Sequence, residues 1–275
     1  MRMLACVVIG VVALPASAGP PPARPSSLAI TDVTVIDAKR GAQHGITVIV
    51  RGDTIVAVGP SAATPVPPGA RVIDGRGKFL TPGLWDAHVH MVDIDEPAFG
   101  ALVAHGVTSV RDMGGDLDKL RAWRDRIAAG QLVGPRIRFC GPMLEGTPDA
   151  LPHGRSDHWL VADPAAATAT IDRIAAAGAD CIKIRSVANE RTFLALAAAA
   201  RRHHLLLVGH PPGGVDAIVA SNAGQASFEH GFYPWPWDSL SADAKKLVAT
   251  TFRTNGSVVT PTLVAWQPFL LPDAT

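Results

Sequence analysis

The chain has 275 residues, of which 48% are hydrophobic and 18% are charged, and its formal net charge at pH 7 is +1. This hydrophobic content excludes a disordered chain, and the length suffices for one large domain or for one large and one small domain. A net charge so close to zero provides no basic field for nucleic acid, so we expect no nucleic-acid partner.

Residues 1–18 have the pattern of a secretory signal peptide. Arg2 precedes a short apolar run from Met3 to Leu14, and Ala-Ser-Ala at 16–18 matches a cleavage site. We therefore expect an exported protein, periplasmic or secreted, with no membrane span after cleavage. The alternative is a retained N-terminal anchor. The proline-rich residues 19–27 are typical of a linker.

Two cysteines, Cys140 and Cys181, remain after the signal peptide. Two cysteines do not make a disulfide framework. Each lies in an apolar stretch that predicts a buried strand, so we expect both to be small core residues.

Residues 28–80 predict a small β-sheet domain, a sandwich. The segment 30–36 alternates in hydrophobicity, as a half-buried strand does. Residues 46–50 predict a second strand, and a turn at Gly52 leads into a third at 54–59. A short strand at 71–74 follows a proline-rich loop.

Residues 81–275 predict a domain built on a (β/α)8 TIM-like barrel, because short apolar strands alternate with helical stretches. Strands are expected to begin near residues 84, 108, 136, 181, 205, 226 and 257, and helices over 96–105, 116–130, 164–178, 188–204, 213–223 and 239–254. An open doubly wound sheet is the competing fold, but it favours a G-x-G-x-x-G turn that this sequence lacks. Only about seven strands are found, so we expect an incomplete barrel without strand eight, in a chain truncated at its C-terminus.

Polar residues end several of these strands, where a barrel places its active site. His88 and His90 are two apart on one strand and so share a face, as two imidazoles binding one metal ion would. Lys183 lies between two isoleucines, where burial favours the neutral amine, which can react with carbon dioxide to give an anionic carbamate ligand. The alternative for Lys183 is an amine that reaches solvent or pairs with Asp112 or Glu229.

His210 and His230 each end a later strand. Either one alone is better explained as a hydrogen-bonded core histidine. Together with His88, His90 and Lys183, they end the first, fourth, fifth and sixth strands at one mouth of the barrel, which favours a shared metal site.

The chain resembles the amidohydrolase superfamily, in the branch of imidazolonepropionase-like and prolidase-like enzymes. The resemblance covers nearly everything after the signal peptide, and the segments that carry it are 30–37, 52–59, 72–74, 80–90, 106–112, 178–184, 209–210 and 228–231. It implies two metal ions, most often zinc, bridged by carboxylated Lys183. His88 and His90 would hold one ion, and His210 and His230 the other.

The resemblance also implies hydrolysis of a C–N bond, amide or peptide, by a metal-bound hydroxide. The expected substrate is a small molecule such as a dipeptide or N-acyl amino acid. A lactonase or esterase that uses the same site is one alternative. A non-catalytic metal-binding fragment is another, because the aspartate that the family places on strand eight as acid and base is absent. Asp273 has no strand around it and does not fill this role, so no catalytic residue is assigned and the 275-residue chain is expected to be impaired or inactive.

Three polar residues lie in the long loop after the third strand: His153, Arg155 and His158. Loops on this side of a barrel line the active site, so these residues are candidates for substrate binding, with a solvated loop as the alternative. Arg111 and Asp112 end the second strand and predict a structural ion pair. The sequence leaves a homo-oligomer open.

Overall fold

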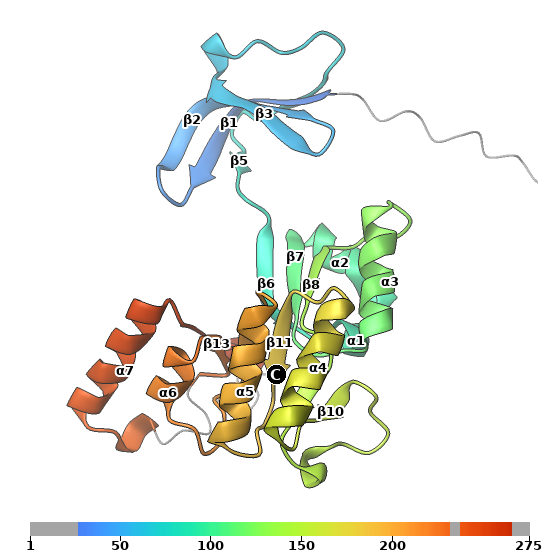
Figure 1. Cartoon of the computed structure of the whole chain (residues 1–275). Helices are drawn as coiled ribbons and strands as arrows, with labels where there is room; N and C mark the ends of the chain where they lie inside the picture. Colours follow the sequence, from blue (N-terminus) through green and yellow to red (C-terminus); the bar gives the residue numbers. More distant parts are fainter. Residues whose placement is uncertain (1–26, 232–236, 266–275) are drawn as a thin grey trace, which may run out of the picture. The chain divides into compact units, whose positions relative to one another are not determined.

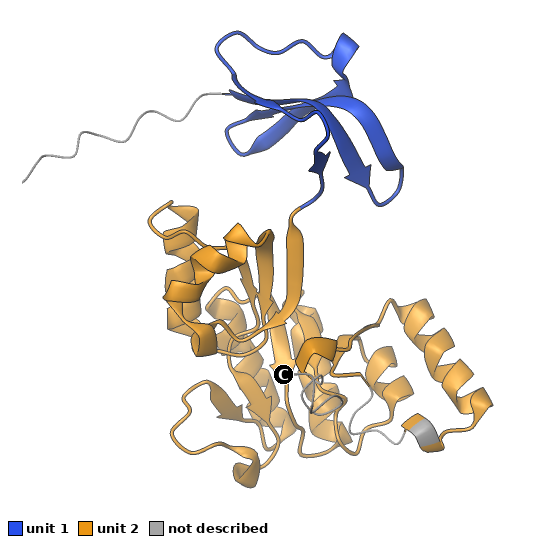
Figure 2. Ribbon diagram, turned by 180° about the vertical axis from the view of Figure 1, so that it is seen from behind, with its two compact units in different colours: residues 1–82 blue, residues 83–275 orange. Residues whose placement is uncertain are grey.

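The computed structural model of the chain describes residues 27–231 and 237–265 (Figure 1). The predicted signal peptide and nearly all of the predicted linker lie outside the described residues, as does Asp273. The chain divides into two compact units after Pro82, coloured separately in Figure 2. Within the described residues, no helix has the length and apolar character that a membrane crossing requires.

The first unit is a single five-stranded sheet. Its elements are β1 (Ser27–Asp37), β2 (Gly41–Arg51), β3 (Thr54–Pro60), η1 (Ser61–Ala63), β4 (Arg71–Asp74) and β5 (Phe79–Leu80). The order is β3-β2-β1-β4, and β5 also pairs with β1. β1 is antiparallel to β2 but parallel to β4 and β5. The described strands therefore form one layer and not the two layers of the expected sandwich, because all five pair edge to edge.

The second unit contains two parallel sheets. The strands β6 (Leu84–Val89), β7 (Val107–Asp112) and β8 (Arg136–Phe139) form the first sheet. The second sheet has the order β10-β9-β11-β12-β13-β14. Its strands are β9 (Met143–Glu145), β10 (His158–Leu160), β11 (Cys181–Ile184), β12 (Leu206–Gly209), β13 (Gln225–Glu229) and β14 (Val258–Thr260).

This arrangement confirms the prediction of parallel strands alternating with helices in an incomplete barrel. The seven predicted strands are β6, β7, β8, β11, β12, β13 and β14. The sequence did not predict β9 and β10. β9 follows β8 after a three-residue break. β8 pairs with β7 on one side and β9 pairs with β11 on the other, so β8 and β9 together occupy the third barrel position.

The helices cover the outer faces of these strands (Figures 1 and 2). They are α1 (Met91–Ile94), η2 (Glu96–Ala98), α2 (Phe99–Ala104), α3 (Leu117–Ala128), η3 (Pro148–Ala150), α4 (Pro164–Ala176), α5 (Glu190–Arg202), α6 (Ala217–Asn222), η4 (Trp237–Ser239) and α7 (Ala242–Asn255). The helix expected over 96–105 is thus a 3-10 turn followed by the short helix α2. The N-cap side chains of α3 to α7 each accept a backbone N–H, which fixes where these helices begin; they are Asp116, Asp163, Asn189, Asp216 and Ser241.

A second, smaller cluster of buried side chains lies apart from the main helix-to-sheet core. It consists of Met113, Cys140, Cys181 and Val208, with Ala226 packed against it. Cys140 and Cys181 are joined by a disulfide, with their Cα atoms 4.2 Å apart. Both are buried, as expected, but they are not independent core residues. The end of β8 and the start of β11 lie side by side, since the Asp180 N–H donates to the Phe139 carbonyl at 2.8 Å.

Candidate metal centre

The structure brings together the four histidines that the sequence singled out. His88 lies in β6 and His90 directly after it, while His210 follows β12 and His230 follows β13. The ring centroids of His88 and His230 are 4.6 Å apart, those of His210 and His230 are 5.0 Å apart, and those of His88 and His90 are 5.5 Å apart. The carboxyl ends of parallel strands meet at one edge, which explains why residues 142 positions apart in the chain become neighbours.

Two local backbone features place the later histidines. Gly209 has φ +136°, and a Cβ there would lie 2.0 Å from the Ile184 carbonyl oxygen. Only glycine therefore allows β12 to approach β11 so closely just before His210. His230 itself has φ 63°, in the left-handed region that a non-glycine residue rarely adopts. Such strain is typical of functional positions, where the surrounding structure holds the residue in place.

Lys183 lies in β11 with its side chain enclosed by protein. Only 1% of the residue is exposed, and Nζ has no hydrogen-bond partner among the described residues. Burial lowers the pKa of Lys183 to about 7, because an uncompensated ammonium is costly in a dry environment. The alternative pairing of this amine with Asp112 or Glu229 is not formed.

The ring of His88 is oriented by Glu229. Glu229 Oε2 lies 2.7 Å from His88 Nδ1, and the carboxylate is fully buried. A proton on Nδ1 that is donated to this carboxylate leaves Nε2 as the lone-pair nitrogen. His88 Nε2 is buried and has no partner among the described residues. A carboxylate behind a histidine is the arrangement that commonly orients metal-binding imidazoles.

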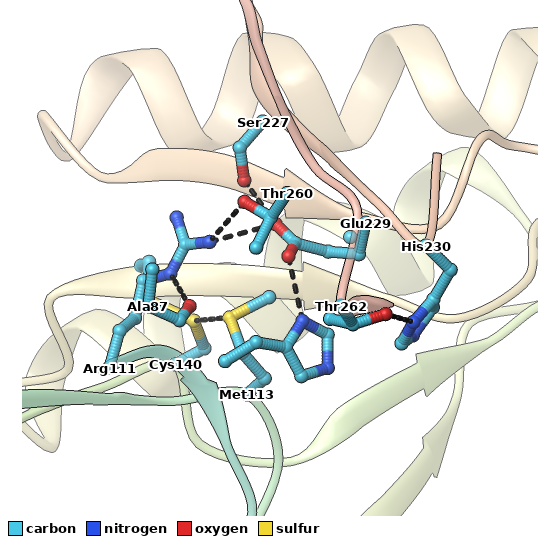
Figure 3. Close-up of polar contacts among 12 residues, drawn as sticks. Ala87, Arg111, Met113, Cys140, Ser227, Glu229, His230, Thr260 and Thr262 are labelled. Carbon is cyan, nitrogen blue, oxygen red and sulfur yellow. Dashed lines mark hydrogen bonds and ion pairs between the residues drawn. A yellow bond between two sulfur atoms is a disulfide. The ribbon is translucent and has the colours of Figure 1, made fainter. Parts of the chain in front are cut away.

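Glu229 is in turn held by a set of donors, which Figure 3 shows around its carboxylate. Arg111 Nη2 donates to Oε1 at 2.8 Å, and the Ser227 hydroxyl donates to the same oxygen. Burial acts to raise the pKa of Glu229, but hydrogen bonds from His88 and Ser227 and the Arg111 charge outweigh it, so the pKa is lowered. Arg111 also donates through Nε to the Ala87 carbonyl at 2.8 Å. The expected structural ion pair of Arg111 is therefore made with Glu229 and not with its neighbour Asp112.

His90 and His230 have their own Nδ1 contacts. His90 Nδ1 lies 3.2 Å from the Gly114 carbonyl oxygen, and His230 Nδ1 lies 2.7 Å from Thr262 Oγ1. Burial is the main cause that lowers the pKa of all four histidines, and it lowers that of His88 to about 4. The neutral imidazole is the form that binds a metal ion.

The chemistry of these side chains fits a divalent transition metal, since imidazole nitrogens are good ligands for zinc. The orphaned, buried Nε2 of His88 and Nζ of Lys183 are the two atoms that such an ion, or a carbamate on the lysine, would give partners. Within residues 27–231 and 237–265, no three His, Cys, Asp or Glu side chains already converge as a metal-ligand group. The residues therefore fit a metal ion by the chemistry of their nitrogen atoms and by the proximity of the histidine rings.

A cavity of about 320 Å³ opens beside these residues. Its lining comes from His90, Asp93, Met143, Pro152, Arg155, His158, Lys183, Arg185 and His210. Two of the three residues proposed for substrate binding, Arg155 and His158, thus line the same cavity as three of the candidate ligands, although His158 begins strand β10 and does not lie in a loop. His153 is exposed and is not part of this lining.

Sequence reasoning missed two residues beside this cavity, Arg185 and Glu145. Arg185 follows β11 directly, two residues after Lys183. Glu145 is fully buried at the end of β9 and bonds both Arg185 and His158. The polar residue directly after a lysine-bearing strand was a signal for Arg185. Nothing marked Glu145, because its strand was not predicted.

Sequence similarity to curated proteins covers about a quarter of the chain. No family model matches the chain. It is 40% identical over 68 residues to adenine deaminase of Rubrobacter xylanophilus, which is 24% of this chain and 11% of that protein. It is 44% identical over 64 residues to imidazolonepropionase of Idiomarina loihiensis, which is 23% of this chain and 16% of that protein. Dihydroorotase of Trichlorobacter lovleyi is 37% identical over 67 residues, or 24% and 15% of the two chains.

Solved structures match over most of the chain. A Bifidobacterium longum protein assigned as a prolidase superposes with a TM-score of 0.72 at 25% identity, over 88% of this chain and 62% of the other. Bottromycin amidohydrolase gives 0.68 at 27% identity, over 92% and 56%. The chain thus spans less than two thirds of the length of these relatives. In its parallel fold and in these sequence segments, the chain is similar to members of the amidohydrolase superfamily.

Proposed function

We propose that the protein is a metal-dependent hydrolase that cleaves a C–N bond, amide or peptide, of a small substrate such as a dipeptide or N-acyl amino acid. The observation that carries the proposal is a pair of buried nitrogens, His88 Nε2 and Lys183 Nζ, which lie among four histidines with lowered pKa and have no hydrogen-bond partner in the described part of the chain. A buried polar atom without a partner is costly unless a ligand supplies one. The names of the relatives support C–N bond chemistry, and the substrate is inferred from the prolidase-like neighbours.

The residues that would hold metal are His88, His90, His210 and His230. When bound, a divalent cation polarises the scissile carbonyl and lowers the pKa of water toward about 7. Glu229 keeps the His88 ring in one orientation, and the Gly114 carbonyl does the same for His90. Held rings lose less freedom on binding than free ones.

Lys183 would supply an anionic ligand as a carbamate. Its neutral Nζ attacks the carbon of carbon dioxide, a C–O electron pair moves onto oxygen, and one proton leaves the nitrogen for solvent. The carbamate would supply a negatively charged oxygen ligand beside the four histidines, and we propose that the site would hold two zinc ions. The lowered pKa of Lys183 supports this step, because only the uncharged amine reacts.

The decisive experiment combines metal analysis with an assay panel on the purified 275-residue chain. We expect one to two equivalents of zinc per chain by mass spectrometry of the metal content. We also expect slow hydrolysis of at least one dipeptide or N-acyl amino acid, in keeping with the impaired activity that the sequence predicts. His88→Ala should lower the zinc content and reduce activity about 10²-fold or more, since ligand loss removes the metal chemistry. The matched control is His105→Ala, an exposed histidine at the end of α2.

Other outcomes would contradict the proposal in distinct ways. Less than one metal per chain, with no effect of His88→Ala, would exclude a metalloenzyme. Hydrolysis of lactones or esters but of no amide would show that the protein is a lactonase or esterase and does not cleave C–N bonds. Metal binding without any turnover would leave a non-catalytic metal-binding chain.

A further inference from the structure

We propose that Arg185 binds a carboxylate of the substrate in the cavity beside the four histidines. The inference deepens the proposed function by naming the group that the site recognises. The identity of the substrate rests on the proposed function, whereas the binding of a carboxylate rests on the geometry around Arg185.

Arg185 is anchored at one of its three guanidinium nitrogens. Nη1 donates to Glu145 Oε1 at 2.6 Å and to the Ala150 carbonyl at 3.4 Å. Glu145 is fully buried and also accepts from the Ser186 hydroxyl at 2.5 Å. His158 Nδ1 lies 3.0 Å from Glu145 Oε1. The anchor is therefore a buried carboxylate, itself fixed from two further sides.

The other edge of the Arg185 guanidinium carries two unused donors. Nε and Nη2 form no hydrogen bond with any described residue. The side chain is 43% exposed, and Arg185 is one of the residues that line the cavity. These two atoms form the fork with which arginine binds a carboxylate through two parallel hydrogen bonds. A guanidinium that is fixed on one edge and free on the fork is organised in advance for such a ligand.

Arg155, the other arginine of the cavity, already binds a carboxylate through its Nε and Nη2 atoms. Its Nε and Nη2 donate to the two oxygens of Asp157 at 2.8 and 2.7 Å, and Nη2 also lies 3.3 Å from Asp93. Arg155 therefore uses the same fork on a carboxylate of the protein itself. Both arginines line the cavity, but only Arg185 has this edge available for a substrate.

The position of Arg185 also suits the reaction. It lies two residues after Lys183, and the same cavity is lined by His90 and His210. A substrate held by its carboxylate at Arg185 would lie against the candidate metal ligands. Dipeptides and N-acyl amino acids both carry a carboxylate close to the C–N bond to be cleaved.

The test compares a carboxylate probe with its neutral isostere. Binding of N-acetyl-L-leucine and of N-acetyl-L-leucinamide to the zinc-loaded chain would be measured by calorimetry. We expect the wild type to bind the acid about 10-fold more tightly or better, as charge-assisted bonds predict. Arg185→Gln should bring the two affinities within about threefold. Arg185→Lys keeps a charge beside Glu145 but lacks the fork, and should retain only part of the preference.

Arg138→Gln is the matched control, because Arg138 pairs with Asp180 outside the cavity and its loss should leave the preference intact. Circular dichroism would verify folding, and Arg185→Lys decides the question if Arg185→Gln does not fold. Equal binding of both probes to the wild type, or an unchanged preference in either folded Arg185 variant, overturns the inference. A carboxylate preference that depends on Arg185, in a protein that hydrolyses nothing, would retain the inference and reject the proposed function.

Discussion

His90 is held by a buried carboxylate that does not contact it. Asp112 Oδ2 accepts the Met91 N–H at 2.7 Å, and Oδ1 accepts the Gly114 N–H at 3.0 Å. The Gly114 carbonyl then contacts His90 Nδ1. Burial raises the pKa of Asp112 to about 7, although both backbone N–H groups favour the carboxylate. Asp112 thus fixes the backbone on either side of the His90 contact.

We predict that Asp112→Asn lowers the free energy of unfolding by about 1–3 kcal/mol, because an amide offers one acceptor oxygen and leaves one buried N–H unsatisfied. Urea denaturation of metal-free protein measures this. Asp116→Asn is the control: Asp116 caps α3 through a single oxygen that accepts from both Asp118 and Lys119. Asparagine caps helices as well as aspartate does, so its effect should stay within about 0.5 kcal/mol. Equal effects of the two variants would contradict this role of Asp112.

At the level of elements, the disulfide links the residue that follows β8 to the first residue of β11. It closes a loop between Cys140 and Cys181, which are 41 positions apart in the sequence, and its sulfur atoms lie in the small buried cluster. Cys181 lies two residues before Lys183 on the same strand, so the two side chains point to the same face. Disulfides persist in oxidising compartments. The bond therefore supports the proposal that the protein is exported, which the signal-like N-terminus suggested.

We predict that replacing both cysteines by serine lowers the free energy of unfolding by about 4 kcal/mol, the chain-entropy value for a loop of this length. Denaturant titrations with and without reductant measure it in the wild type. The double-serine variant should not respond to reductant, which provides the control. The contradicting result comes from a thiol assay on protein that is isolated from the periplasm or medium and unfolded without reductant. If both cysteines react as free thiols, the bond does not form.

At the scale of the whole molecule, the candidate site joins two sheets. His88 lies in the three-stranded sheet and His90 directly follows it. Lys183 lies in the six-stranded sheet, and His210 and His230 directly follow two of its strands. The disulfide and the Glu229 contacts with Arg111 and His88 also run between the two sheets. A metal ion held by both histidine pairs would add a further link.

We therefore predict that zinc raises the melting temperature. A ligand at 100 times its dissociation constant stabilises a protein by about 2.7 kcal/mol, which corresponds to about 5–10 °C in a unit of this size. Thermal unfolding with zinc and with a chelator measures the shift. His88→Ala should reduce it, while His105→Ala should retain it. An equal shift in the two variants would indicate zinc binding elsewhere on the chain.

The sequence by itself predicted the parallel α/β architecture, the seven strands and the side chains that end them. These features are local: apolar strands alternate with helices, and a histidine at a strand end can be read from its neighbours. His88, His90, Lys183, His210 and His230 could accordingly be proposed as site residues from the sequence alone, as could Arg155 and His158.

Only the tertiary structure decided which partners these side chains have. The Cys140–Cys181 bond, the pairing of Arg111 with Glu229 and the anchoring of Arg185 by Glu145 all connect residues 40 or more positions apart. Periodicity carries no information about such contacts, because the lateral packing of the strands creates them. The same packing buries Lys183 and His88, so that Lys183 Nζ and His88 Nε2 have no hydrogen-bond partner among the described residues and the pKa of each side chain is lowered.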